Sequence, residues 1–140
     1  MSNQVVARYR DGRLVKGVSL DLDPTKPTCH VRPAGGKVTE VKLVELKALF
    51  LVKSLDGNPA HDEALIFEAN DRRSSGSTKI EVTFQDGERL VGFTNRFPPN
   101  RSLYYVVPAD LKSNNIRILV NSEAVRSIEA MELEQEPAPE

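Results

Sequence analysis

Few side chains of this 140-residue sequence belong to the types that carry out catalysis or bind metals. The sequence holds one cysteine and two histidines, which are Cys29, His30 and His61. Neighbours along a β-strand point to opposite faces, so Cys29 and His30 cannot converge on one atom. A Cys-His nucleophilic pair is excluded for the same reason, unless His61 folds over Cys29. We expect Cys29 to be a small buried side chain and His30 to be an ordinary strand residue. No cofactor and no metal site is expected.

Two other patterns carry little chemistry. The run Gly35-Gly36-Lys37 lacks the first glycine of a phosphate-binding loop, and we interpret it as a hairpin turn. Asp21 and Asp23 lie two apart at a strand end and share a face, which can chelate a cation, although a solvated loop explains them as well. Because the sequence shows no catalytic constellation, we predict that the chain is not an enzyme.

The arginine pair before the second half resembles a known ligand-binding motif. The segment Arg72-Arg73-Ser74-Ser75-Gly76 resembles part of the arginine motif with which PilZ domains bind a cyclic dinucleotide. Here Asp71 precedes the arginines, the serine spacing differs, and the second motif of that family is missing. Cyclic-dinucleotide binding is therefore kept only as part of an alternative hypothesis.

The elements that must position any site follow from an internal repeat. A shift of 75 positions aligns residues 11–34 with residues 86–109 without a gap. Seven positions are identical, and in the first copy they are Asp11, Gly12, Gly17, Pro24, Val31, Pro33 and Ala34. Past Ala34 the second copy carries about four extra residues within Asp110–Asn115. We interpret this pattern as a duplication.

The repeated pattern is typical of β-structure. Ile80, Val82 and Phe84 alternate with polar residues, and each such run meets an Asp-Gly pair, which is a strong hairpin signal. A glycine in the middle of the next strand, Gly17 or Gly92, predicts a sharp bend or a close backbone approach. The remaining predicted strands are Leu14–Leu22, Thr28–Arg32 and two within Val38–Val52, and in the second copy Arg89–Phe97, Leu103–Val107 and two within Ile116–Glu132.

Five short strands with a glycine-bent second strand resemble Sm-like and SH3-like barrels, and the resemblance covers each repeat. The stretch Phe84–Gly92 with the later Pro108–Asp110 and Ser113–Asn115 resembles an uncharacterised bacterial family of small β domains. That resemblance implies a bacterial source and no particular function. We therefore expect a mainly all-β fold of two tandem, internally duplicated barrels. The expected boundaries are 1–55 and 79–132 for the barrels, 56–78 for a connector and 133–140 for a disordered acidic tail.

Charge is distributed unevenly although the net charge is only −1. Residues 1–55 hold 10 basic and 5 acidic side chains, whereas residues 129–140 hold 5 acidic and no basic ones. Four basic residues are candidates for a phosphate-binding patch. They are Arg8 and Arg10 on the outward face of the first strand, and Lys26 and Arg101 in equivalent loops. A solvated face that keeps the domain soluble is the other interpretation.

The extra residues of the second repeat are the remaining candidates. Asp110, Ser113, Asn114 and Asn115 are residue types that hydrogen-bond their own backbone and build tight loops. The same residues suit a polar recognition loop, because loops on rigid scaffolds often carry function. Both interpretations remain open from the sequence.

A non-enzymatic binding or adaptor module is the function we expect, engaging a protein partner through barrel edges or loops. The alternative is binding of RNA or a nucleotide through the basic first repeat, modulated by the acidic tail. No apolar run is long enough to cross a membrane, and the first residues do not form a secretory signal. With a single cysteine, these features predict a cytoplasmic location and no membrane contact.

Overall fold

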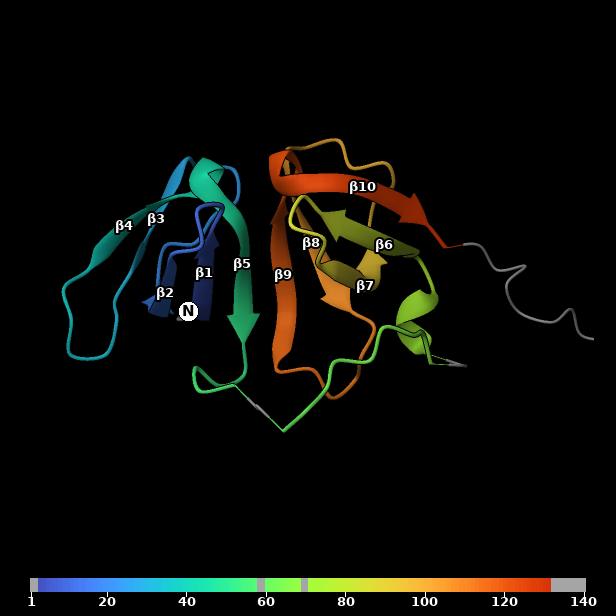
Figure 1. Cartoon of the computed structure of the whole chain (residues 1–140), viewed down its shortest axis with the longest axis horizontal. Coiled ribbons are helices and arrows are strands. Elements are labelled where there is room, and N and C mark those ends of the chain that lie inside the picture. Colours follow the sequence, from blue (N-terminus) through green and yellow to red (C-terminus); the bar gives the residue numbers. More distant parts are fainter. Residues whose placement is uncertain (1–2, 58–59, 69–70, 132–140) are drawn as a thin grey trace, which may run out of the picture.

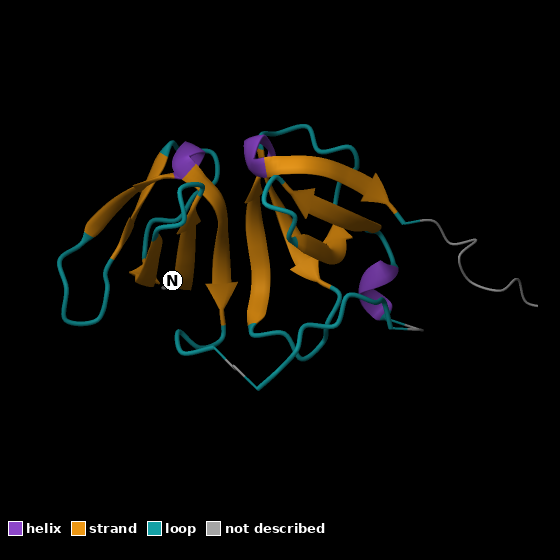
Figure 2. Ribbon diagram, viewed as in Figure 1, coloured by secondary structure: helices purple, strands orange, loops and turns teal. Residues whose placement is uncertain are grey.

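The computed structural model describes residues 3–57, 60–68 and 71–131 (Figure 1, Figure 2). Within them, ten strands and three short 3₁₀-helices follow one another. They are β1 (Asn3–Tyr9), β2 (Leu14–Ser19), β3 (Thr28–Val31), β4 (Thr39–Lys42), η1 (Leu43–Glu45), β5 (Leu46–Val52), η2 (Arg72–Ser74), β6 (Thr78–Phe84), β7 (Arg89–Thr94), β8 (Leu103–Pro108), β9 (Asn115–Asn121), η3 (Ser122–Ala124) and β10 (Val125–Ala130). The prediction of a mainly β fold is confirmed, while the expected tail at 133–140 lies outside the described residues.

Each half begins with the hairpin that its Asp-Gly pair predicts. Gly12 and Gly87 have φ angles of 97° and 92°, in the region that glycine enters without a steric penalty. The Asp11 carboxylate accepts a hydrogen bond from the backbone N–H of Arg13 at 3.0 Å. Asp86 accepts the equivalent bond from Glu88, also at 3.0 Å. Local sequence therefore determines both turns.

Strand pairing in the two halves follows the same register. Val5 pairs with Gly17 in the first hairpin, and Ile80 pairs with Gly92 in the second, so both partners are displaced by 75 positions. A Cβ atom on Gly17 would lie 2.3 Å from the carbonyl oxygen of Arg32. A Cβ atom on Gly92 would lie 2.2 Å from the carbonyl oxygen of Val107, which is 75 positions after Arg32. The predicted close backbone approach at the glycines is confirmed.

The correspondence continues beyond the extra loop residues, where the displacement becomes 79. Cys29 of β3 pairs with Val41 of β4, and Tyr104 of β8 pairs with Val120 of β9. The helices η1 and η3 begin 79 positions apart, and so do the strands β5 and β10 that follow them. Strand β5 therefore corresponds to β10, and β4 corresponds to β9.

The expectation of two closed barrels is not met. Eight strands form one sheet in the order β10-β6-β7-β8-β9-β5-β1-β2, and β3 and β4 form a separate two-stranded sheet. A single bridge, Val18 to Arg32, links that pair to β2. The sheet stays open because β9 uses its outer edge to pair with β5 of the other half (Figure 1). Neither half then closes on itself.

Two hydrophobic cores flank the β5–β9 junction, which we call the seam. The first core contains Leu49 of β5 and Leu119 of β9, and the second contains Ala48 of β5 and Ile118 of β9. Successive residues of each seam strand thus enter opposite cores. Both faces of these strands are buried, which explains why Leu46–Val52 is almost wholly apolar.

Several local expectations can be compared with the structure. Cys29 is fully buried and His30 is exposed, as the strand alternation predicts. Gly35 lies in the turn between β3 and β4, as predicted. Residues 62–68 of the connector form neither a strand nor a helix. Among the described residues, no helix has the length and apolar character that membrane crossing requires.

Candidate functional site

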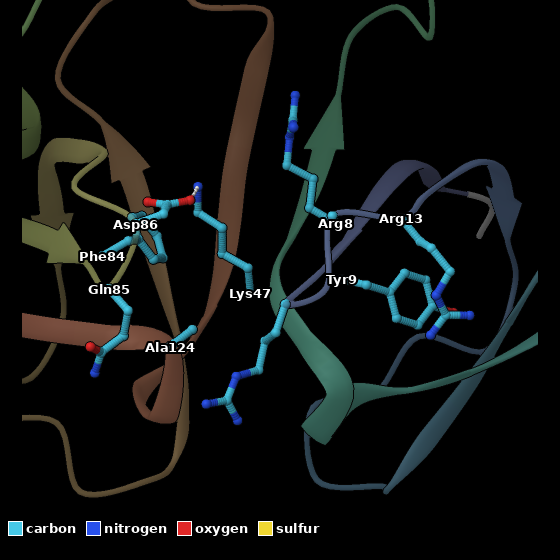
Figure 3. Close-up of a pocket in the computed structure, with 10 residues that line it drawn as sticks. Arg8, Tyr9, Arg13, Lys47, Phe84, Gln85, Asp86 and Ala124 are labelled. Atoms are coloured by element: carbon cyan, nitrogen blue, oxygen red, sulfur yellow. Dashed lines mark hydrogen bonds and ion pairs between the residues drawn. The ribbon is translucent and has the colours of Figure 1, made fainter.

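Arg8 and Arg10, predicted as binding residues, line a cleft of about 270 Å³ at the seam. Figure 3 shows Arg8 there with Lys47 and Asp86. Both halves of the chain contribute to the walls of this cleft. The lining residues are Arg8, Tyr9, Arg10, Gly12, Arg13, Lys47, Phe84, Gln85, Asp86 and Ala124. Four of them are basic, so the cleft is the best candidate for the predicted positive patch.

Ion pairs neutralise most of that positive charge. Nζ of Lys47 lies 2.7 Å from Oδ2 of Asp86 and also contacts Glu88, and the Lys47 side chain is only 12% exposed. The hydrogen bond from Lys47, with a second from the Glu88 N–H, holds the pKa of Asp86 below its ordinary value. Lys47 therefore serves mainly to join the two halves.

The arginines of the cleft differ in their partners. Arg10 lies 3.6 Å from the carboxylate of Glu123, and Arg13 lies 2.8 Å from that of Asp11. Arg8 packs over the ring of Phe50, at 5.9 Å from its centroid. Arg8 is the one cleft arginine for which the described residues provide no carboxylate within 4.0 Å. The patch available to an anion is thus smaller than the sequence count indicates.

Lys26 and Arg101, in equivalent loops, both influence the Asp23 carboxylate. The hydroxyl and then the N–H of Thr25 hydrogen-bond the Asp23 carboxylate and lower its pKa, and the charges of Lys26 and Arg101 lower it further. Both predicted cations thus lie close enough to Asp23 for their charges to act on it. The structure keeps them apart from the Arg8 cleft, whose lining includes neither.

Asp110 is bound from several sides in the loop Asp110–Asn115. Its Oδ2 lies 2.7 Å from Nε2 of His61 and accepts the N–H of Ala64 at 2.8 Å, while Oδ1 accepts the N–H of Lys112. The side chain is only 7% exposed. Asp110 thereby ties the connector to the second half, which is what a tight structural loop requires.

The other three predicted loop residues are also engaged. The Asn114 side chain accepts the N–H of Ser54 at 3.1 Å and donates to the carbonyl of Ser54 at 2.9 Å. Ser113 is buried, and its hydroxyl accepts the N–H of Asn115 at 3.0 Å. These contacts support the structural interpretation of the loop, and a recognition role stays a prediction.

His61, Glu63 and Asp110 form a cluster of metal-ligand types that sequence reasoning missed. One ligand atom from each lies within 4.8 Å of the other two. Burial raises the pKa of Glu63, and the nearby Asp110 carboxylate raises it further. These types suit a divalent metal such as Zn²⁺, but Oδ2 of Asp110 already accepts two hydrogen bonds. His61 and Asp110 are far apart in sequence, so no local signal marks them.

A larger, mostly apolar groove of about 610 Å³ lies on the first half, beside the β3–β4 hairpin. Leu20 and Val38 line it and are 69% and 51% exposed, which is unusual for large aliphatic side chains. One rim carries Asp21, whose Oδ2 lies 2.6 Å from Nδ1 of His30. The groove is lined by Val18, Leu20, Asp21, His30, Arg32, Pro33, Ala34, Gly35, Val38 and Leu55.

The equivalent face of the second half is covered by the chain itself. Phe93, 75 positions after Val18, is buried and meets the ring of Phe67 edge-on, with centroids 5.1 Å apart. The guanidinium of Arg73 lies over the same Phe93 ring at 4.9 Å. The connector therefore occupies on the second half the position that is open as a groove on the first.

Arg73 also binds the backbone at that face. Its two terminal nitrogens donate to the carbonyl oxygens of Pro108 and Ala109, each at 2.9 Å. The equivalent residues of the first half are Pro33 and Ala34, which line the groove. An aromatic ring and a guanidinium thus form the cover of this face.

A family model described as a family of unknown function, DUF6982, matches residues 1–132. The chain belongs to the DUF6982 family. Comparison with curated proteins and with solved structures finds no match. The resemblance to an uncharacterised family is thereby confirmed, and it carries no activity to this DUF6982 member.

For this DUF6982 chain, the sequence did contain a faint signal for the groove. Lys16, Val18 and Leu20 alternate with residues of the inner face, so two aliphatic side chains occupy outward positions of one strand. Whether such positions are covered depends on the connector, which the strand pattern does not describe. The groove therefore emerged only from the tertiary structure.

Proposed function

We propose that this chain is a non-enzymatic binding module that docks an extended segment of a partner protein in the groove beside the β3–β4 hairpin. One observation carries the proposal: the groove is open on the first half, while Phe67 and Arg73 cover the equivalent face of the second. The segment bound would present an aromatic side chain followed by an arginine, because those groups fit the same face elsewhere in the molecule.

The lining of the groove agrees with such a ligand. Val18 is smaller than Phe93, its equivalent, so an aromatic ring has room above it. The Asp21 carboxylate, 48% exposed at the rim, can receive a cationic side chain. Exposed Leu20 and Val38 would gain most from being covered, since burial of apolar surface drives association.

The proposal includes the finer description of the fold. We regard residues 3–52 and 78–130 as two copies of one five-stranded unit related to Sm-like and SH3-like domains, in a bacterial cytoplasmic protein. The registers displaced by 75 and 79 positions support the duplication. RNA or nucleotide binding at the cleft that Arg8 lines is the alternative. The observation that favours it is that the described residues place no carboxylate within 4.0 Å of Arg8.

A binding measurement tests the proposal. The probe is a fluorescently labelled peptide with the sequence of residues 63–74, which includes the aromatic and arginine groups of the cover. We expect fluorescence anisotropy to give a Kd of about 100 µM or tighter. Leu20→Asp in the groove should weaken binding at least about tenfold, while Leu111→Asp, an exposed leucine of the second half, should not.

Two outcomes would overturn it. If the peptide does not bind, or binds Leu20→Asp and the unchanged chain equally, the groove is not its docking site. If a labelled RNA oligonucleotide binds instead and Arg8→Glu abolishes that binding, the RNA alternative replaces the protein-binding one.

A further inference from the structure

The seam joins unlike edges of the two halves. In it Leu49 of β5 pairs with Leu119 of β9, and Phe50 pairs with Ile118. Because β5 corresponds to β10 and β9 corresponds to β4, the seam connects the last strand of one unit to the fourth strand of the next. A contact between two different edges of similar units is heterologous, and it leaves the complementary edges unused.

Those complementary edges are the ends of the structure. Strand β10 is the terminal strand of the eight-stranded sheet and pairs with β6 on one side. Strand β4 pairs with β3 on one side. Within the described residues, neither strand pairs with a further strand on its other side. The two edges lie on different halves of the molecule (Figure 1).

We propose that β10 of one copy of the chain pairs antiparallel with β4 of a second copy, repeating the seam between molecules. The displacement of 79 positions specifies the register. The seam pair Leu49–Leu119 corresponds to Ile128 of one copy opposite Glu40 of the other. The seam pair Phe50–Ile118 corresponds to Glu129 opposite Thr39. The contact joins two strand edges of this chain and not a partner segment in the groove, so the inference goes beyond the proposed function, although Val38 of the groove directly precedes Thr39.

The main ion pair of the seam has a counterpart at the new contact. Lys47 of the first half meets Asp86 of the second. The equivalent of Lys47, 79 positions later, is Arg126, and the equivalent of Asp86, 75 positions earlier, is Asp11; both keep the same charge and are exposed. A guanidinium of one copy therefore faces a carboxylate of the next.

The contact between copies is weaker than the seam. Glu129 and Thr39 replace the apolar pair of Phe50 and Ile118, so little apolar surface is buried. Arg13, which stands where Glu88 stands in the second half, reduces the attraction for Arg126. Charged side chains on an edge strand oppose edge-to-edge pairing, so the pairing that we propose is weak and reversible. Because the contact is heterologous, repetition produces a ring or an open chain of copies.

Cross-linking of the full chain tests the register. A chain with Glu129→Cys is mixed with a chain with Thr39→Cys, at about 200 µM, a concentration at which weak complexes form. We expect a disulfide-linked dimer. The matched control replaces Thr39→Cys with Ile116→Cys, an exposed residue at the start of β9 that is outside the proposed contact. It should cross-link at least about tenfold more slowly.

Charge reversal gives a second measurement that does not depend on cysteine chemistry. Sedimentation of the unmodified chain should show a mass that rises with concentration, and Arg126→Glu should weaken association about fivefold, the effect of one exposed ion pair. Arg72→Glu, an exposed arginine away from both edges, should leave it unchanged. A chain that stays monomeric at about 1 mM, or equal cross-linking of the test and control cysteines, would overturn the proposal.

Discussion

Nζ of Lys47, on β5, lies 2.7 Å from Oδ2 of Asp86, in the first turn of the second half. The same lysine lies over the ring of Phe84 at 4.7 Å, so its charge is largely withdrawn from solvent. One side chain thus connects the two halves by an ion pair and by packing. This contact, together with the β5–β9 pairing, makes the two halves one structural unit.

Replacing Lys47 should loosen the seam. We expect Lys47→Met to lower the free energy of unfolding by about 1 kcal/mol, since both carboxylate partners stay partly solvated after the cation is removed. Lys53→Met, at an exposed position, should change it by less than about 0.5 kcal/mol. Urea unfolding followed by circular dichroism measures both, and equal effects would contradict the role of Lys47.

The same ion pair predicts a dependence on pH. The pKa of Asp86 is lowered in the folded chain, so its contribution is present above its unfolded value near 3.8 and is lost as pH falls through the folded value. The free energy of unfolding should therefore decrease on acidification, and less steeply in Lys47→Met. Parallel pH profiles for the two chains would show that pairing with Lys47 does not lower the pKa of Asp86.

The mid-strand glycines should tolerate no side chain. We expect Gly17→Ala and Gly92→Ala each to destabilise the fold by about 3 kcal/mol or more, because the new Cβ would lie within 2.3 Å of a backbone carbonyl oxygen. Gly36→Ala meets only the Pro33 side chain at 3.3 Å and should cost less than about 1 kcal/mol. Denaturant midpoints of the three variants measure these losses, and a similar midpoint for all three would contradict the close approach at Gly17 and Gly92.

Arg73 should hold the connector on the second half. Arg73→Ala removes two hydrogen bonds to carbonyl oxygens and uncovers Phe93, so we expect a loss of about 2 kcal/mol. Arg73→Lys should recover little of this stability, because one ammonium group cannot donate to both carbonyl oxygens as the two terminal nitrogens of the guanidinium do. Hydrogen exchange should accelerate in residues 64–68, whereas Arg72→Ala at the exposed neighbouring position should leave their exchange unchanged.

Tyr104 should ionise late in a titration with base. Burial raises its pKa to about 12, and burial also raises the pKa of Tyr9 and of Tyr105 above 10.0. Absorbance at about 295 nm should therefore show late ionisation, and the phase near 12 that Tyr104→Phe removes belongs to Tyr104. Its neutral form is favoured in the fold, so stability is complete below the unfolded pKa and declines as pH rises toward 12. Tyr104→Phe should flatten that decline, and an unchanged profile would refute the assignment.

Much of the local structure is predictable from particular residues. The alternation around Ile80 and Val82 specifies a half-buried strand, and the Asp-Gly pair at 86–87 specifies its turn, because both depend on neighbours in sequence. The two strands predicted within Val38–Val52 are confirmed as β4 and β5, and η1 separates them at Leu43, which is buried. Of the candidate site residues, Arg8 lies on the exposed face of β1 as predicted, and Arg10 is exposed one residue past the end of that strand.

What the sequence by itself determined is the type, order and repetition of the strands, because these follow from alternation, turn residues and a constant displacement. Only the tertiary structure decided that β9 pairs with β5, that the sheet therefore stays open, and that Phe67 and Arg73 cover one half but not the other. A strand's two edges carry the same backbone groups, so local sequence cannot say which edge finds a partner. That choice depends on contacts between residues far apart in the chain.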